Sequence, residues 1–163
     1  MKQLLIVYHS MTGATEQLAR AAAAGAQSEH GVMTRLVRAP IAGVDDVLAA
    51  DGYLFATPEN LATMAGLMKD LFDRVYYPVL DRINGRPYAA IIAAGTDGTG
   101  AARQLLRIAT GLRLREIAQP LVLRNGAQTP EAILAPKTVP PGDLALAGDL
   151  GLALAAGLAS GVF

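Results

Sequence analysis

Residues 6 to 19 read Ile-Val-Tyr-His-Ser-Met-Thr-Gly-Ala-Thr-Glu-Gln-Leu-Ala, and they carry the strongest fold signal in the chain. The apolar run Leu4 to Tyr8 lacks a polar face, which is typical of a parallel strand buried on both sides. The Ala-rich segment Glu16 to Gln27 consists of strong helix formers. The residues between these two runs therefore connect a buried strand to a helix.

This connection has the composition of an anion-binding loop. Three hydroxyl groups and one glycine fall within six residues, and the glycine permits a tight backbone turn. A helix that begins near Thr15 directs its free N–H groups and its positive dipole end into the same loop. We expect a phosphate to bind residues Ser10, Met11, Thr12, Gly13, Ala14 and Thr15. In the alternative interpretation, Thr15 only caps the helix and Ser10 only completes a turn.

The absence of Lys and Arg from the loop limits the class of phosphate that it suits. A Walker-type loop needs a second glycine and a lysine, because the lysine offsets the charge of a polyphosphate. The Gly-x-Gly-x-x-Gly pattern of dinucleotide sites is also missing. A neutral set of hydroxyls and amides suits a single terminal phosphate, such as that of FMN.

The same stretch resembles the N-terminal signature of the flavodoxin family. That signature has apolar residues, an aromatic residue, a Ser/Thr two positions later, then a small residue, a Thr and an Ala. The matching positions are Ile6, Val7, Tyr8, Ser10, Gly13, Thr15 and Ala19. Arg20 departs from it, since the signature prefers an aliphatic residue there. The resemblance implies a domain in which three loops surround FMN.

Composition indicates one α/β domain spanning residues 1–163. The chain is 52% hydrophobic and 17% charged, against about 25% charged in ordinary globular proteins. The high hydrophobic fraction and low charged fraction indicate strands and helices that are buried on more than one side. Lys and Arg number 14, as do Asp and Glu. This balance gives no electrostatic reason to expect a nucleic-acid partner.

The residue counts argue against disulfides, metal sites and a secretory signal. The chain has no cysteine, which excludes disulfides and thiolate chemistry. Its two histidines, His9 and His30, are not spaced as metal ligands, so we expect no metal. The N-terminal apolar run is too short for a signal peptide, and we expect a cytoplasmic protein without membrane insertion.

Strand-like and helix-like segments alternate along the chain. The expected strands are Gln3 to Tyr8, Met33 to Arg38, Gly52 to Ala56, Tyr88 to Ala94 and Pro120 to Arg124. The expected helices are Glu16 to Gln27, Val44 to Ala49, Met64 to Tyr76, Ala101 to Leu112 and Asp143 to Ala159. This alternation predicts a parallel sheet covered by helices on both faces. We expect a flavodoxin-like three-layer sandwich with five strands in the order 2-1-3-4-5.

Two C-terminal segments need separate interpretation. Thr129 to Pro141 is rich in proline and is expected to be a long connection. Leu144 to Phe163 consists mainly of Leu, Ala and Gly, as a membrane span would. Asp149 within it makes a span unfavourable, so we expect a helix that packs closely against the sheet.

The loop after the third expected strand, Thr57-Pro-Glu-Asn-Leu-Ala-Thr63, is a candidate for flavin contact. Pro58 restricts the backbone before any ligand binds, and Asn60 can donate and accept hydrogen bonds. Alternatively, Thr63 is simply the N-cap of a helix that begins at Met64. The segment resembles the second flavin loop of tryptophan-repressor-binding-type NAD(P)H:quinone oxidoreductases. That resemblance assigns flavin contacts to Thr57, Pro58, Glu59, Asn60 and Leu61.

The loop after the fourth expected strand reads Ala-Gly-Thr-Asp-Gly-Thr-Gly from Ala94 to Gly100. Its glycines allow close approach to a ligand, or equally a tight turn into a helix. By resemblance it is the third flavin loop, with contacts from Gly95, Thr96, Asp97 and Gly98. The His-Gly-Gly stretch common in the quinone reductases is missing. The resemblance extends over about residues 3 to 110.

These features predict an FMN-dependent oxidoreductase that uses NAD(P)H and passes electrons to a quinone or similar small acceptor. Neither flavin loop contains an aromatic residue and the net charge is zero, whereas electron-carrier flavodoxins stack aromatics on the ring and are acidic. We nominate no catalytic residue. Glu59 and Asp97 are hypothesised to lower the flavin potential. A one-electron carrier acting on a redox partner protein and a flavin-free binding module remain alternatives, and a homodimer or homotetramer is compatible with the resemblance.

Overall fold

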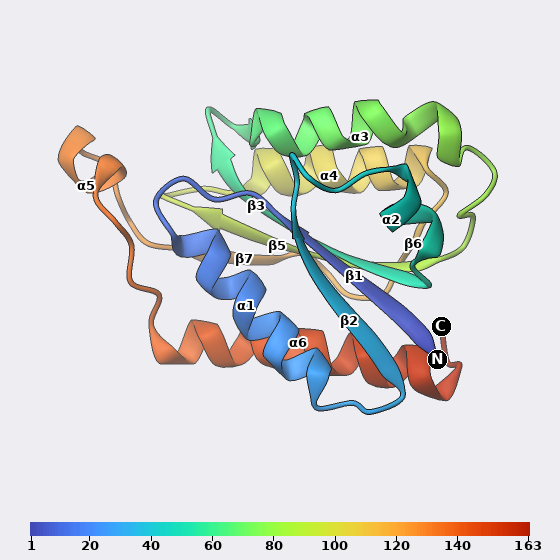
Figure 1. Ribbon diagram of the computed structural model, residues 1–163. Coiled ribbons are helices and arrows are strands. Elements are labelled where there is room, and N and C mark those ends of the chain that lie inside the picture. The colour runs from blue at the N-terminus through green and yellow to red at the C-terminus, as the bar shows by residue number, and fades with distance from the viewer.

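A seven-stranded sheet forms the middle layer of the structure, a computed structural model that describes residues 1–163 (Figure 1). Its path runs β2-β1-β3-β5, after which both β6 and β7 pair with β5. All pairs are parallel except β3 with β4. The strands are β1 Lys2–Tyr8, β2 Val32–Arg38, β3 Gly52–Asn60, β4 Thr63–Met64, β5 Pro87–Ala94, β6 Arg115–Glu116 and β7 Leu121–Arg124.

Helices cover both faces of the sheet. One layer contains α1 and α6, and the opposite layer contains α2, α3 and α4 (Figure 1). The helices are α1 Ala14–Gln27, α2 Val44–Ala49, α3 Gly66–Val79, α4 Thr99–Gly111, α5 Pro130–Leu134 and α6 Pro141–Ser160. This arrangement confirms the expected flavodoxin-like fold and the order of the five main strands.

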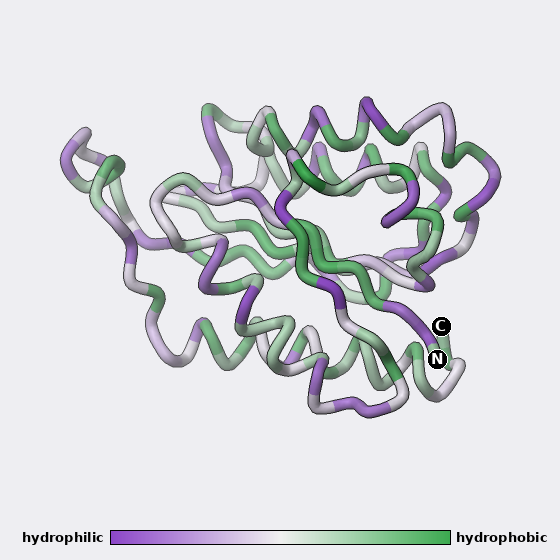
Figure 2. The backbone as a smooth tube through the Cα atoms, in the orientation of Figure 1, coloured by the Kyte–Doolittle hydropathy of each residue, from purple (hydrophilic) through white to green (hydrophobic).

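The central strands are buried on both faces, as their sequence predicts. In β1, Leu4 and Ile6 face the layer of α1 and α6, while Leu5 and Val7 face the opposite layer. Figure 2 shows the resulting hydrophobic strands in the middle layer between the two helix layers. Because both faces are covered, the ends of the strands are the accessible parts of the sheet, and ligands bind at the carboxyl ends in such folds.

Close backbone contact joins α1 to α6. A Cβ atom on Gly25 would collide with the carbonyl group of Gly148, and one on Gly151 would collide with that of Ala22. Small residues in α6 therefore permit this approach, as expected. The helix buries only one side, since Leu152 on its outer side is 40% exposed. By length and hydropathy alone α6 could cross a membrane, but its packing along α1 already explains its apolar inner side.

Several expected boundaries were wrong. The third strand continues to Asn60 and returns through β4, so Met64 lies in a strand and α3 begins at Gly66. The expected Thr63 N-cap is also wrong, because Ala65 holds that position. The sheet has two strands more than the predicted five, namely the two-residue strands β4 and β6. Within the expected long connection, residues Pro130–Leu134 form a short helix.

The two chain termini lie at the same end of the molecule (Figure 1). They are at the amino ends of the parallel strands, whereas the loops that follow β1, β3 and β5 are at the opposite end. The candidate ligand loops are therefore far from both termini.

Replacing Gly151 with Ala should destabilise the fold, because the new methyl group meets the backbone of Ala22. Overpacking of this kind reduces the free energy of unfolding by about 1–3 kcal/mol. Gly142→Ala in the same helix has open space around its Cβ and should be neutral or stabilising by about 0.5–1 kcal/mol. Urea unfolding of both variants measures the difference, and equal stabilities would contradict the close helix contact.

Candidate functional site

The loop between β1 and α1 leaves a set of hydrogen-bond donors unused. Gly13 has a φ of 98° and is the N-cap, and it provides no side-chain cap. The first helical hydrogen bond runs from Gln17 N to Gly13 O at 3.1 Å. The preceding amides, of Ala14, Thr15 and Glu16, therefore have no acceptor within the helix. This is the arrangement that binds phosphate at a helix N-terminus.

The hydroxyl groups of this loop have different roles. Ser10 Oγ accepts a hydrogen bond from the Gly13 amide at 3.1 Å, so Ser10 does complete a turn. Thr15 is not the helix cap, because it lies inside the first turn and is 1% exposed. Its hydroxyl group forms no hydrogen bond with another protein group, which leaves it able to bind a ligand beside the free amides. Thr12 is half-buried and Met11 is 80% exposed.

A distant segment holds the loop in place. The Gln17 side-chain amide donates to Gly13 O at 2.9 Å and to Lys137 O at 2.8 Å, and its oxygen accepts from Val139 N at 3.1 Å. Lys137 N also donates to Thr12 O at 2.8 Å. The loop is therefore fixed before a ligand arrives. Sequence analysis missed Gln17, because its partners Lys137 and Val139 lie 120 and 122 residues away.

Charge near the loop is balanced within the protein. Glu16 lies in the first turn of α1, where a carboxylate would oppose a bound phosphate. Its Oε1 accepts from Arg20 Nη2 at 2.7 Å and from Arg20 Nε at 3.0 Å. Arg20, which departs from the flavodoxin signature, is thus a surface residue that neutralises Glu16.

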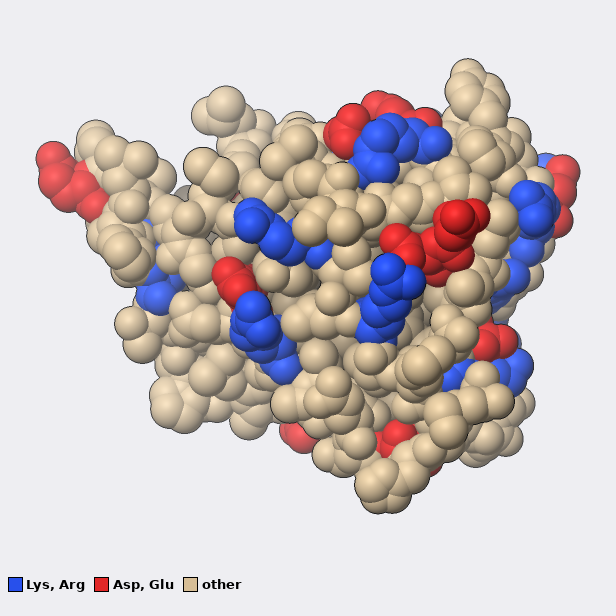
Figure 3. Space-filling view, viewed as in Figure 1, with Lys and Arg blue, Asp and Glu red and all other residues tan.

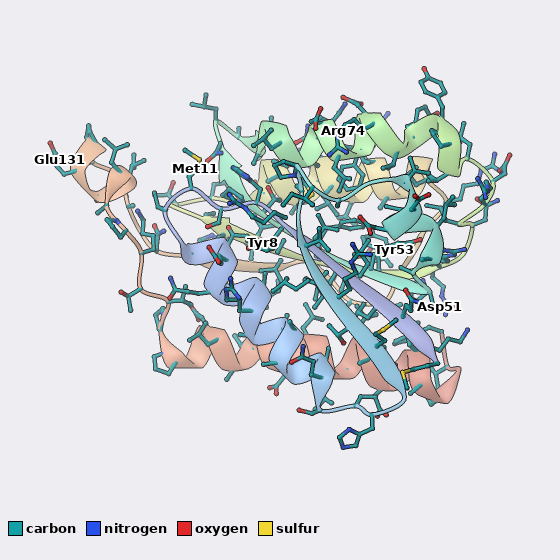
Figure 4. The ribbon with its side chains drawn as sticks, viewed as in Figure 1. Tyr8, Met11, Asp51, Tyr53, Arg74 and Glu131 are labelled. Carbon is teal, nitrogen blue, oxygen red and sulfur yellow. The ribbon has the colours of Figure 1, made fainter.

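The second predicted loop is a β-hairpin formed by β3 and β4. Its tip residues, Leu61 and Ala62, both have positive φ, at 51° and 67°. This conformation is unfavourable for residues other than glycine and is often found at functional sites. The Leu61 side chain is 99% exposed. The hairpin therefore presents an apolar tip at the same end of the molecule as Met11 (Figure 4).

Thr57 and Pro58 shape the base of this hairpin. Thr57 is fully buried, and its Oγ1 accepts from Ala65 N at 3.1 Å and donates to Pro58 O at 3.0 Å. The hydroxyl group of Thr57 is therefore used to place the start of α3. Asn60 is exposed, and the side chain of Pro58 is half-buried.

Glu59 joins the hairpin to α4. Its two carboxylate oxygens accept from Gly98 N at 2.8 Å and from Ala101 N at 3.0 Å. Gln104 Oε1 accepts from Met64 N at 2.8 Å, and a Cβ atom on Gly100 would collide with the Ala62 carbonyl. The carboxylate thus caps α4 from outside the helix. The second and third predicted flavin loops are held together as one unit.

In the third loop, Gly95 to Gly98, the last amide is already engaged within the protein. Gly98 N is occupied by Glu59, and Thr99 N donates to Asp97 Oδ1 at 3.2 Å. Our expectation that Gly98 donates to a ligand is therefore disfavoured, although Thr96 and Asp97 remain exposed. Gly95 is close to the Ala127 carbonyl, at 2.8 Å from an added Cβ, so the glycine is needed for packing.

The pKa of Asp97 is lowered, chiefly because its carboxylate accepts a hydrogen bond from the Thr99 hydroxyl at 2.7 Å. The Thr99 amide, Arg124 and Arg103 act in the same direction. Asp97 is therefore ionised at neutral pH. Its suggested influence on a flavin potential stays a prediction.

His9 is buried immediately before the phosphate loop. It is 5% exposed, and its Nδ1 has no hydrogen-bond partner. Burial, with a smaller contribution from the positive charge of Arg38, lowers the pKa of the imidazole. The side chain is therefore a neutral packed group at neutral pH.

A cavity of about 210 Å³ lies beside the start of α1. Its lining includes Ala14, Leu18, Leu123, Arg124 and Val139 and no residue of the second loop. The cavity therefore reaches the first predicted loop at Ala14 but not the second loop. On the face seen in Figure 3, acidic and basic side chains alternate, so no charge of one sign marks a ligand there.

Removing the Glu59 carboxylate should loosen the junction of the two loops. Glu59→Ala leaves two amides without their acceptor and should lower the free energy of unfolding by about 2 kcal/mol, as loss of a helix cap does. Glu59→Gln keeps one accepting oxygen, so its free energy of unfolding should fall by less than that of Glu59→Ala. Urea unfolding and hydrogen exchange at Gly98 and Ala101 measure the effect. Glu116→Ala, on the surface, is the control. Equal effects in both alanine variants would contradict a stabilising role for the hydrogen bonds from Gly98 N and Ala101 N to Glu59.

The lowered pKa of His9 predicts a pH dependence of stability. Below its ordinary pKa of 6.5, His9 gains a proton in the unfolded chain but stays neutral in the folded protein. The unfolded state then binds more protons, so stability falls as pH drops from 6.5 to the lowered pKa of the folded state. His9→Gln should flatten this slope, while His30→Gln, at an exposed position, should retain it. Urea unfolding on both sides of pH 6.5 tests this, and an unchanged slope in His9→Gln would refute it.

Comparison with known proteins places this chain in a family. The family described as NADPH-dependent FMN reductase matches residues 40–129, which is more than half of the chain. A flavodoxin of Aquifex aeolicus is 34% identical over 100 residues, covering 61% of this chain and 54% of that protein. An NAD(P)H dehydrogenase (quinone) of Acidithiobacillus ferrooxidans is 33% identical over 94 residues, covering 45% and 47%.

The chain spans about half the length of these curated relatives. Among solved structures, a WrbA-like flavodoxin from Agrobacterium tumefaciens superposes with a TM-score of 0.75 at 18% identity, covering 99% of each chain. This structural likeness supports the fold. From the family match over residues 40–129, the chain belongs to the NADPH-dependent FMN reductase family.

Proposed function

We propose that this chain binds FMN, with the phosphate held at the N-terminus of α1. One observation carries this proposal: the amides of Ala14, Thr15 and Glu16 and the Thr15 hydroxyl lie together without protein acceptors. Neutral donors of this kind suit one terminal phosphate, and the helix dipole favours its negative charge. The fixed shape of the loop, through Gln17 and Ser10, lowers the entropy lost on binding.

The isoalloxazine ring would lie against the second and third loops. Asn60 and the exposed Thr96–Asp97 backbone supply polar groups for the edge of the ring, while Leu61 and Met11 supply apolar contact. No aromatic side chain occurs in these loops to cover the ring. One face would remain open to a second planar molecule, such as a nicotinamide or a quinone.

The activity that we propose is NAD(P)H-dependent oxidation-reduction with a quinone or similar small molecule as acceptor. Bound FMN supplies the hydride chemistry, and the chain binds and orients it. The family match and the named quinone dehydrogenase support this choice. The relative named flavodoxin instead favours a one-electron carrier with a protein partner. We place the activity in a single domain of residues 1–163 in the cytoplasm.

The first experiment is a visible absorption spectrum of the protein after incubation with FMN and desalting. A retained and shifted flavin band supports FMN binding by this chain, and a colourless eluate would refute it. NADPH or NADH is then added with a quinone. Steady oxidation of NADPH or NADH supports a reductase. Negligible oxidation of both by a protein that has retained FMN favours a one-electron carrier.

Thr15→Val should weaken FMN binding without disturbing the fold, because it removes one hydroxyl group and keeps the side-chain shape. Loss of one hydrogen bond to a charged group raises the dissociation constant by roughly tenfold or more. Fluorescence titration of FMN measures this change. Thr110→Val alters an exposed threonine of α4 that bonds to Leu106 O, and it should bind FMN normally. Equal affinity in both variants would exclude Thr15 from the site.

A further inference from the structure

The cavity of about 210 Å³ lies where the first turn of α1 meets the segment that leads into α6. Lys137 N donates to Thr12 O at 2.8 Å, and Val139 N donates to Gln17 Oε1 at 3.1 Å. This segment therefore crosses beside the phosphate loop. The strands β5 and β7 contribute the rest of the lining at their carboxyl ends.

The cavity extends away from the surface that we propose for the isoalloxazine ring. No residue of the second or third candidate flavin loop lines it. Ala14 does line it, and the amide of Ala14 is one of the free donors of the phosphate loop. A group that enters the cavity from the phosphate loop would therefore extend the ligand beyond the phosphate of FMN.

One part of the lining is apolar. Leu18 and Val139 are buried, and together with Leu123 they present aliphatic side chains to the cavity. Ligand sites typically combine apolar surface of this kind with a small number of polar groups. A flat heterocyclic base suits this part of the cavity, because its faces are apolar.

The other part of the lining carries charges that form no ion pairs with one another. Arg124 Nε donates to Asp97 O at 2.7 Å, which leaves the terminal N–H groups of Arg124 unused. Lys137 Nζ donates only to backbone carbonyl oxygens. Asp143, in the first turn of α6, lines the same cavity but pairs with neither cation. Such an arrangement suits a ligand with an anionic group at one place and hydroxyl donors at another.

These charges complement the neutral phosphate loop. The loop contains no Lys or Arg, and a ligand with more than one phosphate needs added positive charge. Arg124 and Lys137 supply two cations beside the loop, where a second phosphate would follow the first. The carboxylate of Asp143 can accept hydrogen bonds from ribose hydroxyls, as acidic residues do in dinucleotide sites.

The size of the cavity indicates that it holds one part of a larger ligand. Sites for complete drug-sized molecules measure about 300–1,000 Å³, whereas this cavity measures about 210 Å³. Its contact with the phosphate loop at Ala14 gives the remainder of the ligand a place outside the cavity.

We infer that the cavity binds the adenosine monophosphate (AMP) unit of a dinucleotide. The base packs against Leu18 and Val139, and the ribose hydroxyls donate to Asp143. The phosphate is bound by Arg124 and Lys137. FAD and NAD(P)H both carry this unit. Its connection to a flavin phosphate rests on the proposed function, whereas binding of free AMP does not.

AMP should bind the protein without flavin, and an NMR chemical-shift titration measures its dissociation constant. Thr138 is exposed and lines the cavity, so Thr138→Trp should fill the entrance and abolish this binding. Asp143→Asn should weaken it roughly tenfold, because a hydrogen bond to a charged group is lost. Gln128→Trp is the matched control, since Gln128 is exposed in the same connection and does not line the cavity. No binding of AMP, or equal binding by both Trp variants, would overturn the inference.

Titrations with whole dinucleotides identify the one that carries the unit. If it is FAD, the flavin-free protein should bind FAD roughly tenfold tighter than FMN. Thr138→Trp should then remove this difference without changing the affinity for FMN. If it is NAD(P)H, FAD should bind no tighter than FMN, and Thr138→Trp should weaken binding of oxidised NADP to the FMN-loaded protein. A Thr138→Trp variant that matches the wild type in both titrations would refute the inference, whereas a protein that binds AMP but not FMN would contradict only the proposed function.

Discussion

Backbone N–H groups at the start of a helix need acceptors, and this requirement distinguishes α1 from α4, which both begin at the ligand end of the sheet. The first-turn amides of α4 receive the Glu59 carboxylate from the neighbouring hairpin. Those of α1 receive nothing from the protein, although the surrounding loop is firmly held. The same dipole is thus compensated internally in one helix and left for an anion in the other.

Long-range contacts make the three loops act as a single frame. Glu59 connects the hairpin to α4, and the 125–139 segment connects the α4 side to the phosphate loop through Gly95, Thr12 and Gln17. None of these contacts depends on a ligand. A flavin would therefore meet a surface that is already arranged, and binding would require little reordering of the backbone.

The fold could be predicted from local patterns, because buried parallel strands and Ala-rich helices leave periodic signals. The turn between β1 and α1 could also be predicted, since Ser10, Gly13 and Thr15 are close in sequence, while phosphate binding by this loop stays a prediction. The hairpin could not, because its tip is Leu61-Ala62 rather than the Asn-Gly type that marks such turns.

The hydrogen bonds that join the loops could not be predicted from the sequence, for a different reason. Glu59 and Ala101 are 42 residues apart, and Gln17 and Lys137 are 120 apart, so no local pattern links them. Glu59 in particular was predicted to contact a flavin, and no local pattern indicated that its carboxylate caps a helix. Sequence patterns thus identified the three loops, but the side-chain contacts that hold them together depend on tertiary structure.

The position of the termini has a practical consequence for fusing this protein to other domains or attaching it to a surface. Both ends of the chain lie at the end of the molecule where the parallel strands begin (Figure 1). A reporter domain, an affinity tag or a surface linker joined at either end would therefore sit away from the loops. A short peptide could also join the two ends, which would allow new termini to be opened elsewhere, for example in the exposed turn around Gly85. Immobilised or permuted forms of the protein should thus keep the ligand edge accessible to solution.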